Sequence, residues 1–155
     1  MGDAGHVRQS KDLAYRASLV TLWVLALLWG MVCPAIASGP ELREIRFEKG
    51  KDGEESVLFL LNGDYPPKTF AIEGKEPRLV CDFLDAGLDK KVKNFTKTDG
   101  RLINTIRVGI HLSPVPKTRV VLDLWPDQDY EVHQAFFHGE KIYALVLRLK
   151  DIPLK

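Results

Sequence analysis

Three side chains in one short run have the chemistry to bind a carbohydrate that carries carboxylate groups. Arg119, Asp123 and Trp125 stand at alternate positions, so an extended chain places all three on one face. A tryptophan ring offers a flat apolar surface on which a sugar ring can lie. An arginine fork binds a carboxylate through two parallel hydrogen bonds, and an aspartate accepts hydrogen bonds from hydroxyl groups. The pattern therefore predicts a row of candidate ligand-binding residues: Arg119, Asp123 and Trp125.

Three more residues extend this row if their strands are neighbours. Arg78 and Asp82 share one face of the extended segment 78–84, and Arg107 lies in the segment 103–110. An alternative interpretation is that the arginines and aspartates form ion pairs across adjacent strands on a solvated sheet face. The sequence leaves both interpretations open.

The sequence contains no set of residues typical of a catalytic or metal site. After residue 37 the histidines are His111, His133 and His138, and none has zinc-site spacing. Neither a Gly-x-Ser-x-Gly turn nor a phosphate-binding glycine loop occurs in this part. Cys81 is the sole cysteine after residue 37, and we expect it to be buried and inert. We therefore expect a protein that is not an enzyme and needs no cofactor or metal.

The elements that must position these residues are eight short strands, each bounded by turn-forming residues. They are predicted at about 42–49, 55–62, a run through Phe70 and Ile72, 78–84, 103–110, 117–125, 129–137 and 141–149. The segment from Asp85 to Arg101 between them is rich in lysine and aspartate. We expect a solvated crossover loop there, with one helical turn as a variant, although its lysines Lys90, Lys91, Lys93 and Lys97 also fit a basic patch.

The strands occur as the same unit twice. The first half covers about 42–84 and the second about 103–149. The matching segments are 45–47 with 106–108, 57–61 with 120–124, and 79–81 with 145–147. No stretch after residue 37 has a convincing helical apolar period. We therefore predict an all-β fold, a β-sandwich of two roughly four-stranded sheets with an internal pseudo-repeat.

The first 37 residues are predicted to be an export signal. Arg8, Lys11 and Arg16 precede an uncharged stretch from 17 to 40, and Ala35-Ile36-Ala37 fits the small-x-small cleavage pattern. The alternative is an uncleaved membrane anchor, since the uncharged stretch is long enough to span a bilayer. Both interpretations place residues 38–155, one domain by length, outside the cytoplasm.

The composition of residues 38–155 excludes two classes of partner. This part carries 19 basic and 19 acidic residues, so it is formally neutral. A nucleic-acid-binding protein requires a basic surface, and so does attraction to an anionic membrane. We expect contact with a membrane only through the N-terminal segment.

Several of these segments resemble the AMIN domain, a non-catalytic module that precedes periplasmic N-acetylmuramoyl-L-alanine amidases. Related modules precede the secretin part of type IV pilus outer-membrane proteins. The resemblance is carried by the segments 77–82, 106–109 and 118–124, and in strand order it covers nearly all of 41–149. It implies a two-sheet sandwich and a periplasmic location.

The resemblance also implies a function, either binding to peptidoglycan or recruitment to division and pilus sites. On the first interpretation, we expect the row of Arg and Asp residues with Trp125 to bind peptidoglycan, and the domain to localise cell-wall machinery. On the second, the domain is a protein adaptor for a secretin, an amidase or a divisome protein and does not bind glycan directly.

Overall fold

The structure is a computed structural model that describes residues 39–150. The predicted export signal at 1–37 and the C-terminal residues 151–155 lie outside the described residues. The strands are β1 (Glu41–Lys49), β2 (Glu55–Leu61), β3 (Lys68–Ile72), β4 (Arg78–Leu84), β5 (Gly87–Leu88), β6 (Phe95–Lys97), β7 (Ile103–His111), β8 (Lys117–Leu124), β9 (Tyr130–Phe137) and β10 (Ile142–Leu149). A 3-10 turn, η1 (Lys51–Gly53), joins β1 to β2. No helix in the described part is long and apolar enough to cross a membrane.

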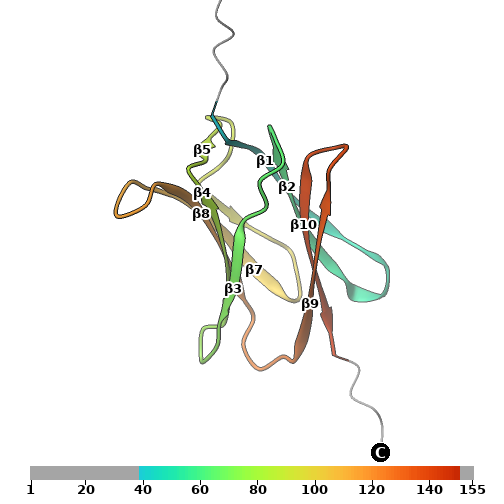
Figure 1. Cartoon of the computed structure of the whole chain (residues 1–155). Coiled ribbons are helices and arrows are strands. Elements are labelled where there is room, and N and C mark those ends of the chain that lie inside the picture. Colours follow the sequence, from blue (N-terminus) through green and yellow to red (C-terminus); the bar gives the residue numbers. More distant parts are fainter. Residues whose placement is uncertain (1–38, 151–155) are drawn as a thin grey trace, which may run out of the picture. The chain divides into compact units, whose positions relative to one another are not determined.

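The strands form two five-stranded sheets that pack as a sandwich (Figure 1). The β2 sheet has the order β5-β1-β2-β10-β9, and the β8 sheet has the order β3-β4-β8-β7-β6. The predicted all-β sandwich is confirmed, with one more strand in each sheet than the four expected. Both extra strands come from the segment between the halves, where β5 and β6 pair with β1 and β7. The segment contains no helix, and the hydrogen bond from the Val92 N–H to the Asp89 carbonyl (3.0 Å) closes a single turn there.

The sheet order shows the internal repeat. Exchanging each first-half strand with its second-half counterpart turns the order β1-β2-β10-β9 into β7-β8-β4-β3. The bulges also correspond, since the register shifts between Leu42 and Glu44 in one sheet and between Ile103 and Thr105 in the other. Each sheet therefore contains two long strands from each half. As a result, first-half residues on β4 lie beside second-half residues on β8.

The strand register corrects one of the sequence matches. Val57 pairs with Leu145, and its counterpart Val120 pairs with Cys81. Cys81 thus corresponds to Leu145 rather than to Leu147. A shift of two residues keeps a side chain on the same face of its strand, so the predicted inward position of Cys81 is unaffected.

The hydrophobic core fills the space between the two sheets. Strand β2 shows the reason, because every second residue from Glu55 to Leu61 is fully buried. The core residues of the described segment lie between Leu42 and Leu147, so this segment has a core formed by its own residues. Cys81 is buried as predicted, and burial raises the pKa of its thiol to about 12.

Candidate binding face

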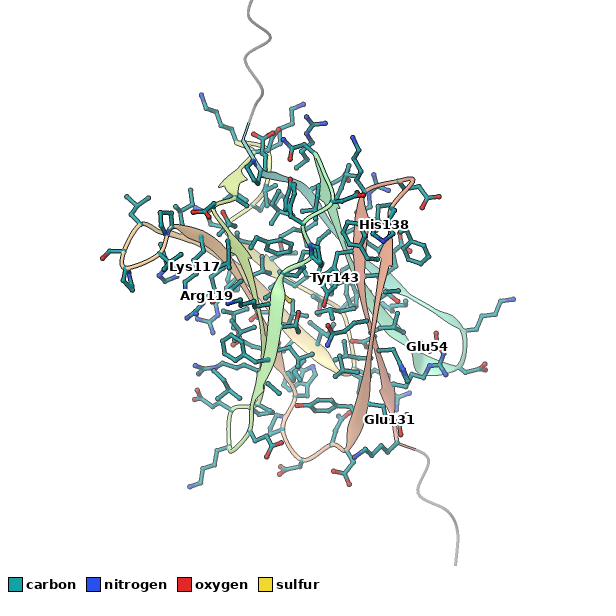
Figure 2. The ribbon with its side chains drawn as sticks, viewed as in Figure 1. Glu54, Lys117, Arg119, Glu131, His138 and Tyr143 are labelled. Atoms are coloured by element: carbon teal, nitrogen blue, oxygen red, sulfur yellow. The ribbon has the colours of Figure 1, made fainter. Side chains whose placement is uncertain are left out.

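The outer face of the β8 sheet brings the predicted Arg and Asp residues together. Across β4 and β8, Arg78 stands opposite Asp123 and Asp82 stands opposite Arg119. Arg107 lies on β7, the next strand. Figure 2 shows Lys117 and Arg119 on the side of the molecule away from Glu54 and Glu131. All five predicted strand residues therefore belong to one surface, here called the β8 face, which draws on both halves of the chain.

Asp82 is held by two cations at one side of this face. The Arg119 guanidinium donates from Nε (2.6 Å) and Nη2 (2.7 Å) to the two carboxylate oxygens. Lys117 Nζ lies 3.0 Å from the same carboxylate, which is 6% exposed. The hydrogen bond from Arg119, the largest influence, lowers the pKa of Asp82 below its ordinary value.

Asp123 forms the centre of a second cluster. Arg107 donates to it from Nε (2.7 Å) and Nη2 (2.6 Å), and the Thr105 hydroxyl donates as well. Arg78 Nε lies 3.4 Å away. Burial raises the pKa of Asp123, but the hydrogen bonds from Arg107 and Thr105 outweigh it, so the net shift is downward. The cross-strand ion pairs considered from the sequence therefore form.

The ion pairs still leave donors available to a ligand. Both arginines use the Nε and Nη2 side of the guanidinium to grip a carboxylate. Among the described residues, Nη1 of Arg107 and of Arg119 has no hydrogen-bond partner. The paired aspartates fix the orientation of each guanidinium, because a bidentate contact allows one geometry.

Exposed aromatic rings flank this charged centre. Trp125 directly follows β8, is 42% exposed, and lines a depression of about 480 Å³ together with Arg78 and Arg107. Phe70 on β3 and Phe95 on β6 are also exposed, and the Arg119 guanidinium lies 5.8 Å from the centre of the Phe70 ring. The sequence prediction missed both phenylalanines. Alternation along β3 and β6 places both rings on the β8 face, but this could be recognised only once the strand order was known.

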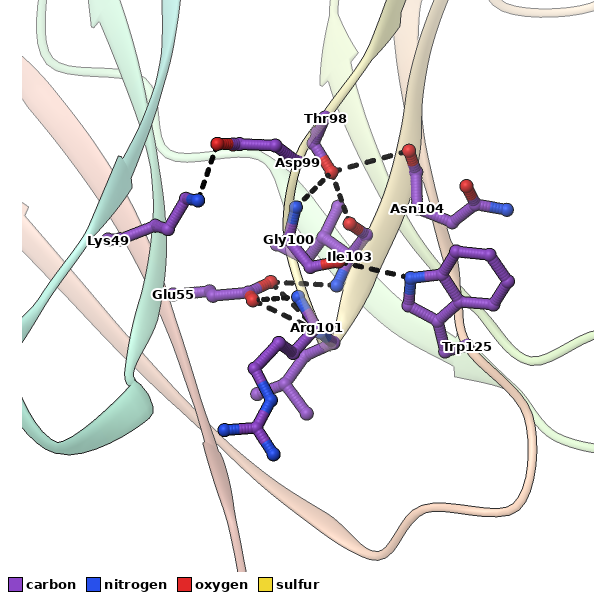
Figure 3. A network of polar contacts seen from close by, with 10 residues as sticks. Lys49, Glu55, Thr98, Asp99, Gly100, Arg101, Ile103, Asn104 and Trp125 are labelled. Atoms are coloured by element: carbon purple, nitrogen blue, oxygen red, sulfur yellow. Dashed lines mark hydrogen bonds and ion pairs between the residues drawn. The ribbon is translucent and has the colours of Figure 1, made fainter.

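A buried carboxylate supports the position of Trp125 (Figure 3). Trp125 Nε1 donates to the Gly100 carbonyl (3.2 Å), in the loop before β7. Glu55 at the start of β2 accepts hydrogen bonds from the backbone N–H groups of Leu102 (3.1 Å), Ile103 (2.8 Å) and Arg101. A Cβ atom at Gly100 would come within 2.5 Å of the Glu55 carboxylate, so only glycine fits there.

The sequence prediction also missed Glu55. Its signal was a charged residue in the inward row of Val57, Phe59 and Leu61. A carboxylate at a core position must find donors, since burying an unpaired charge is costly. Here the donors are backbone groups of a loop that begins more than 40 residues later in the chain, which the sequence did not reveal.

The described residues contain no group of three His, Cys, Asp or Glu side chains that could hold a metal ion.

A family model described as the AMIN domain matches residues 44–148. The chain belongs to the AMIN domain family. This confirms the resemblance seen in the sequence. The AMIN domain is a non-catalytic cell-envelope module of amidases and secretins. No curated protein matches the chain.

Proposed function

We propose that this AMIN domain is exported to the periplasm and binds peptidoglycan through the β8 face, and so localises cell-wall machinery. The observation that supports this function is the arrangement of Trp125, Phe70 and Phe95 around two oriented arginines. Peptidoglycan has the complementary chemistry, because its sugar rings can stack on aromatic side chains and its stem peptides carry carboxylates.

Each part of the face has a role in this proposal. A sugar ring stacks on the exposed ring of Trp125, in the depression that Arg107 also lines. Stem-peptide carboxylates accept hydrogen bonds from Nη1 of Arg107 and Arg119. The aspartates act as positioning residues, since they hold the arginines in one orientation before the ligand arrives and so reduce the entropy lost on binding.

Co-sedimentation of residues 38–155 with purified sacculi tests the proposal. We expect binding at moderate salt, and a loss of at least tenfold on Trp125→Ala or Arg119→Ala. Phe137→Ala is the matched control, because Phe137 is a 50% exposed aromatic residue on the other sheet. Circular dichroism checks that each variant is folded. Protein that stays in the supernatant contradicts the proposal, and an equal loss in Phe137→Ala contradicts the choice of face.

A second candidate function is that of a protein adaptor for an amidase, a secretin or a divisome protein. The outer face of the β2 sheet favours it, because aliphatic residues occupy the centre of that face. Leu58, Leu60, Ile142 and Val146 are partly exposed there, beside Phe137. Apolar groups on a sheet's solvent face are typical of protein contacts. A photo-crosslinker at Leu58 should then yield protein adducts in cells, whereas one at Val121 on the β8 face should not.

A further inference from the structure

Strand β1 leaves part of its edge without a partner strand. Strand β5 pairs with β1 only at Glu41 and Leu42. From Arg43 to Lys49, within the described part of the chain, no strand lies on the side of β1 away from β2. An unpaired strand edge offers backbone donors and acceptors to which another extended chain can bond.

A groove lies beside this free edge. It has a volume of about 580 Å³ and lies between β1 and the crossover segment 89–96. This size falls within the roughly 300–1,000 Å³ range typical of ligand sites. Ile45, Phe47 and Val92 line it and are partly buried against the core.

The groove is bounded by contacts on either side of this stretch of β1. The Asp89 N–H donates to the Leu42 carbonyl (2.9 Å), and this bond ties the crossover segment to β1. Lys49 and Asp99 form an ion pair further along the strand. Both contacts join β1 to the segment between the halves, so the groove between them is a built feature of the fold.

The rim of the groove carries three cations, two of which are free to meet a ligand. Arg43, Lys91 and Lys93 line it. Arg43 Nε lies 3.6 Å from the Glu41 carboxylate, whereas neither lysine forms an ion pair within the described residues. Two carboxylates line it as well: Glu44 is paired with a cation, whereas Asp89 keeps its negative charge, so the three cations leave the lining net positive. Glu44 binds Arg46 through two hydrogen bonds of 2.7 and 2.8 Å.

The second carboxylate, Asp89, accepts a hydrogen bond from the backbone N–H of Lys91 (2.8 Å) and so stabilises the turn that presents the lysines. A ligand that enters the groove therefore meets apolar walls, unpaired backbone groups and a positive rim.

We infer that this groove binds an acidic peptide segment of a partner protein in extended conformation. The segment adds as a strand to β1 between Arg43 and Phe47. Its alternate side chains point the same way, so one row packs on Ile45, Phe47 and Val92. The other row carries the carboxylates that meet Lys91 and Lys93. This site is separate from the β8 face and does not rest on the proposed peptidoglycan binding.

The charge and shape of the groove favour a peptide over other anionic polymers. A nucleic acid requires a larger basic surface than three cations on a neutral domain provide. It also has no row of apolar side chains to match the walls of the groove. A strand with alternating acidic and apolar residues satisfies the edge, the walls and the rim together.

NMR titration of ¹⁵N-labelled residues 38–155 tests this inference. The probe is an acetylated heptapeptide that alternates glutamate with valine, and the control peptide replaces each glutamate by lysine. We expect saturable shifts of the amide signals at 43–47 and 91–93 with the glutamate peptide alone. Hydrogen exchange of the free β1 edge should slow when this peptide is bound.

Two double variants with the same change of charge separate the groove from general electrostatics. Lys91→Gln with Lys93→Gln should weaken peptide binding at least tenfold and leave binding to sacculi unchanged. Lys90→Gln with Lys97→Gln, in the same segment but outside the groove lining, should change peptide binding less than twofold. The inference is overturned if millimolar peptide causes no saturable shift, if the shifts fall on the β8 face, or if both double variants weaken binding equally.

Discussion

Replacing Glu55 by alanine should destabilise the domain far more than its position at the start of a strand suggests. The carboxylate is 2% exposed and accepts hydrogen bonds from the backbone of Arg101, Leu102 and Ile103. Each buried donor that loses its partner costs about 1–3 kcal/mol. The Leu102 and Ile103 donors are buried, whereas the Arg101 donor is only partly so. We therefore expect a loss of about 4 kcal/mol, a large share of a typical domain stability of roughly 5–15 kcal/mol.

Two further variants sharpen this prediction. Glu55→Gln keeps one acceptor oxygen in place, so about 2 kcal/mol should be lost. Glu54→Ala is the matched control, since Glu54 is the neighbouring residue but forms a partly exposed ion pair with Arg148. A pair of this kind contributes about 0–1 kcal/mol.

Urea unfolding of residues 38–155 measures these losses by circular dichroism. Fluorescence adds a local readout, because Trp125 is the sole tryptophan in this part of the chain. Its Nε1 donates to the Gly100 carbonyl, in the loop whose backbone binds Glu55. Glu55→Ala should shift the native emission of Trp125, while Glu54→Ala should not. The scatter of neutral surface changes is roughly 0.5 kcal/mol. If the unfolding free energies of the two alanine variants differ by less than this, the proposed role of the Glu55 hydrogen bonds is refuted.

Two other predictions concern titration and reactivity. The pKa values of Asp82 and Asp123 are lowered in the folded state. The ionised aspartates therefore stabilise the fold fully above the ordinary carboxyl pKa near 3.9. This stabilisation is lost as the pH falls through the lower pKa values of the folded state. The urea midpoint should therefore drop between about pH 4 and pH 2, and less steeply in Asp82→Asn; an unchanged slope in that variant would contradict this cause. Cys81 is fully buried with a pKa raised to about 12, so Ellman's reagent at pH 8 should label it only across the unfolding transition. Rapid stoichiometric labelling of the folded domain would show that the Cys81 thiol is accessible to solvent.

Much of the fold could be predicted from local patterns. Alternation of apolar residues and turn chemistry predicted all eight long strands, because these signals depend on neighbours in the chain. The segment from Asp85 to Arg101 was harder. Its short strands β5 and β6 exist because β1 and β7 present edges to them, and that reason is not visible within the segment itself.

The composition of the candidate site was predictable from the sequence, but its geometry was not. Arg119 and Asp123 were assigned correctly to one face, since parity along a strand decides it. That Arg119 binds Asp82 while Arg107 binds Asp123 depends on the order β4-β8-β7 and on the register, both of which are long-range. Phe70 and Glu55 were missed for the same reason. Each acts through a residue that is distant in the sequence.

The two outer faces of this symmetric scaffold differ in the contact each can make. Where the β8 sheet has Arg119 and Asp123, the β2 sheet has Ser56 and Leu60 at the corresponding positions. Outward positions do not have to fit the core, so packing does not explain what occupies them. Ion pairs occupy the β8 face, whereas burying the aliphatic face would contribute roughly 25 cal/mol per Å² of apolar area. Contact with glycan on one sheet and with protein on the other is thus compatible within one molecule. Under that arrangement a crosslink from Leu58 to a partner protein should persist in the presence of sacculi, and displacement of the partner by sacculi would show that the two contacts compete for one face.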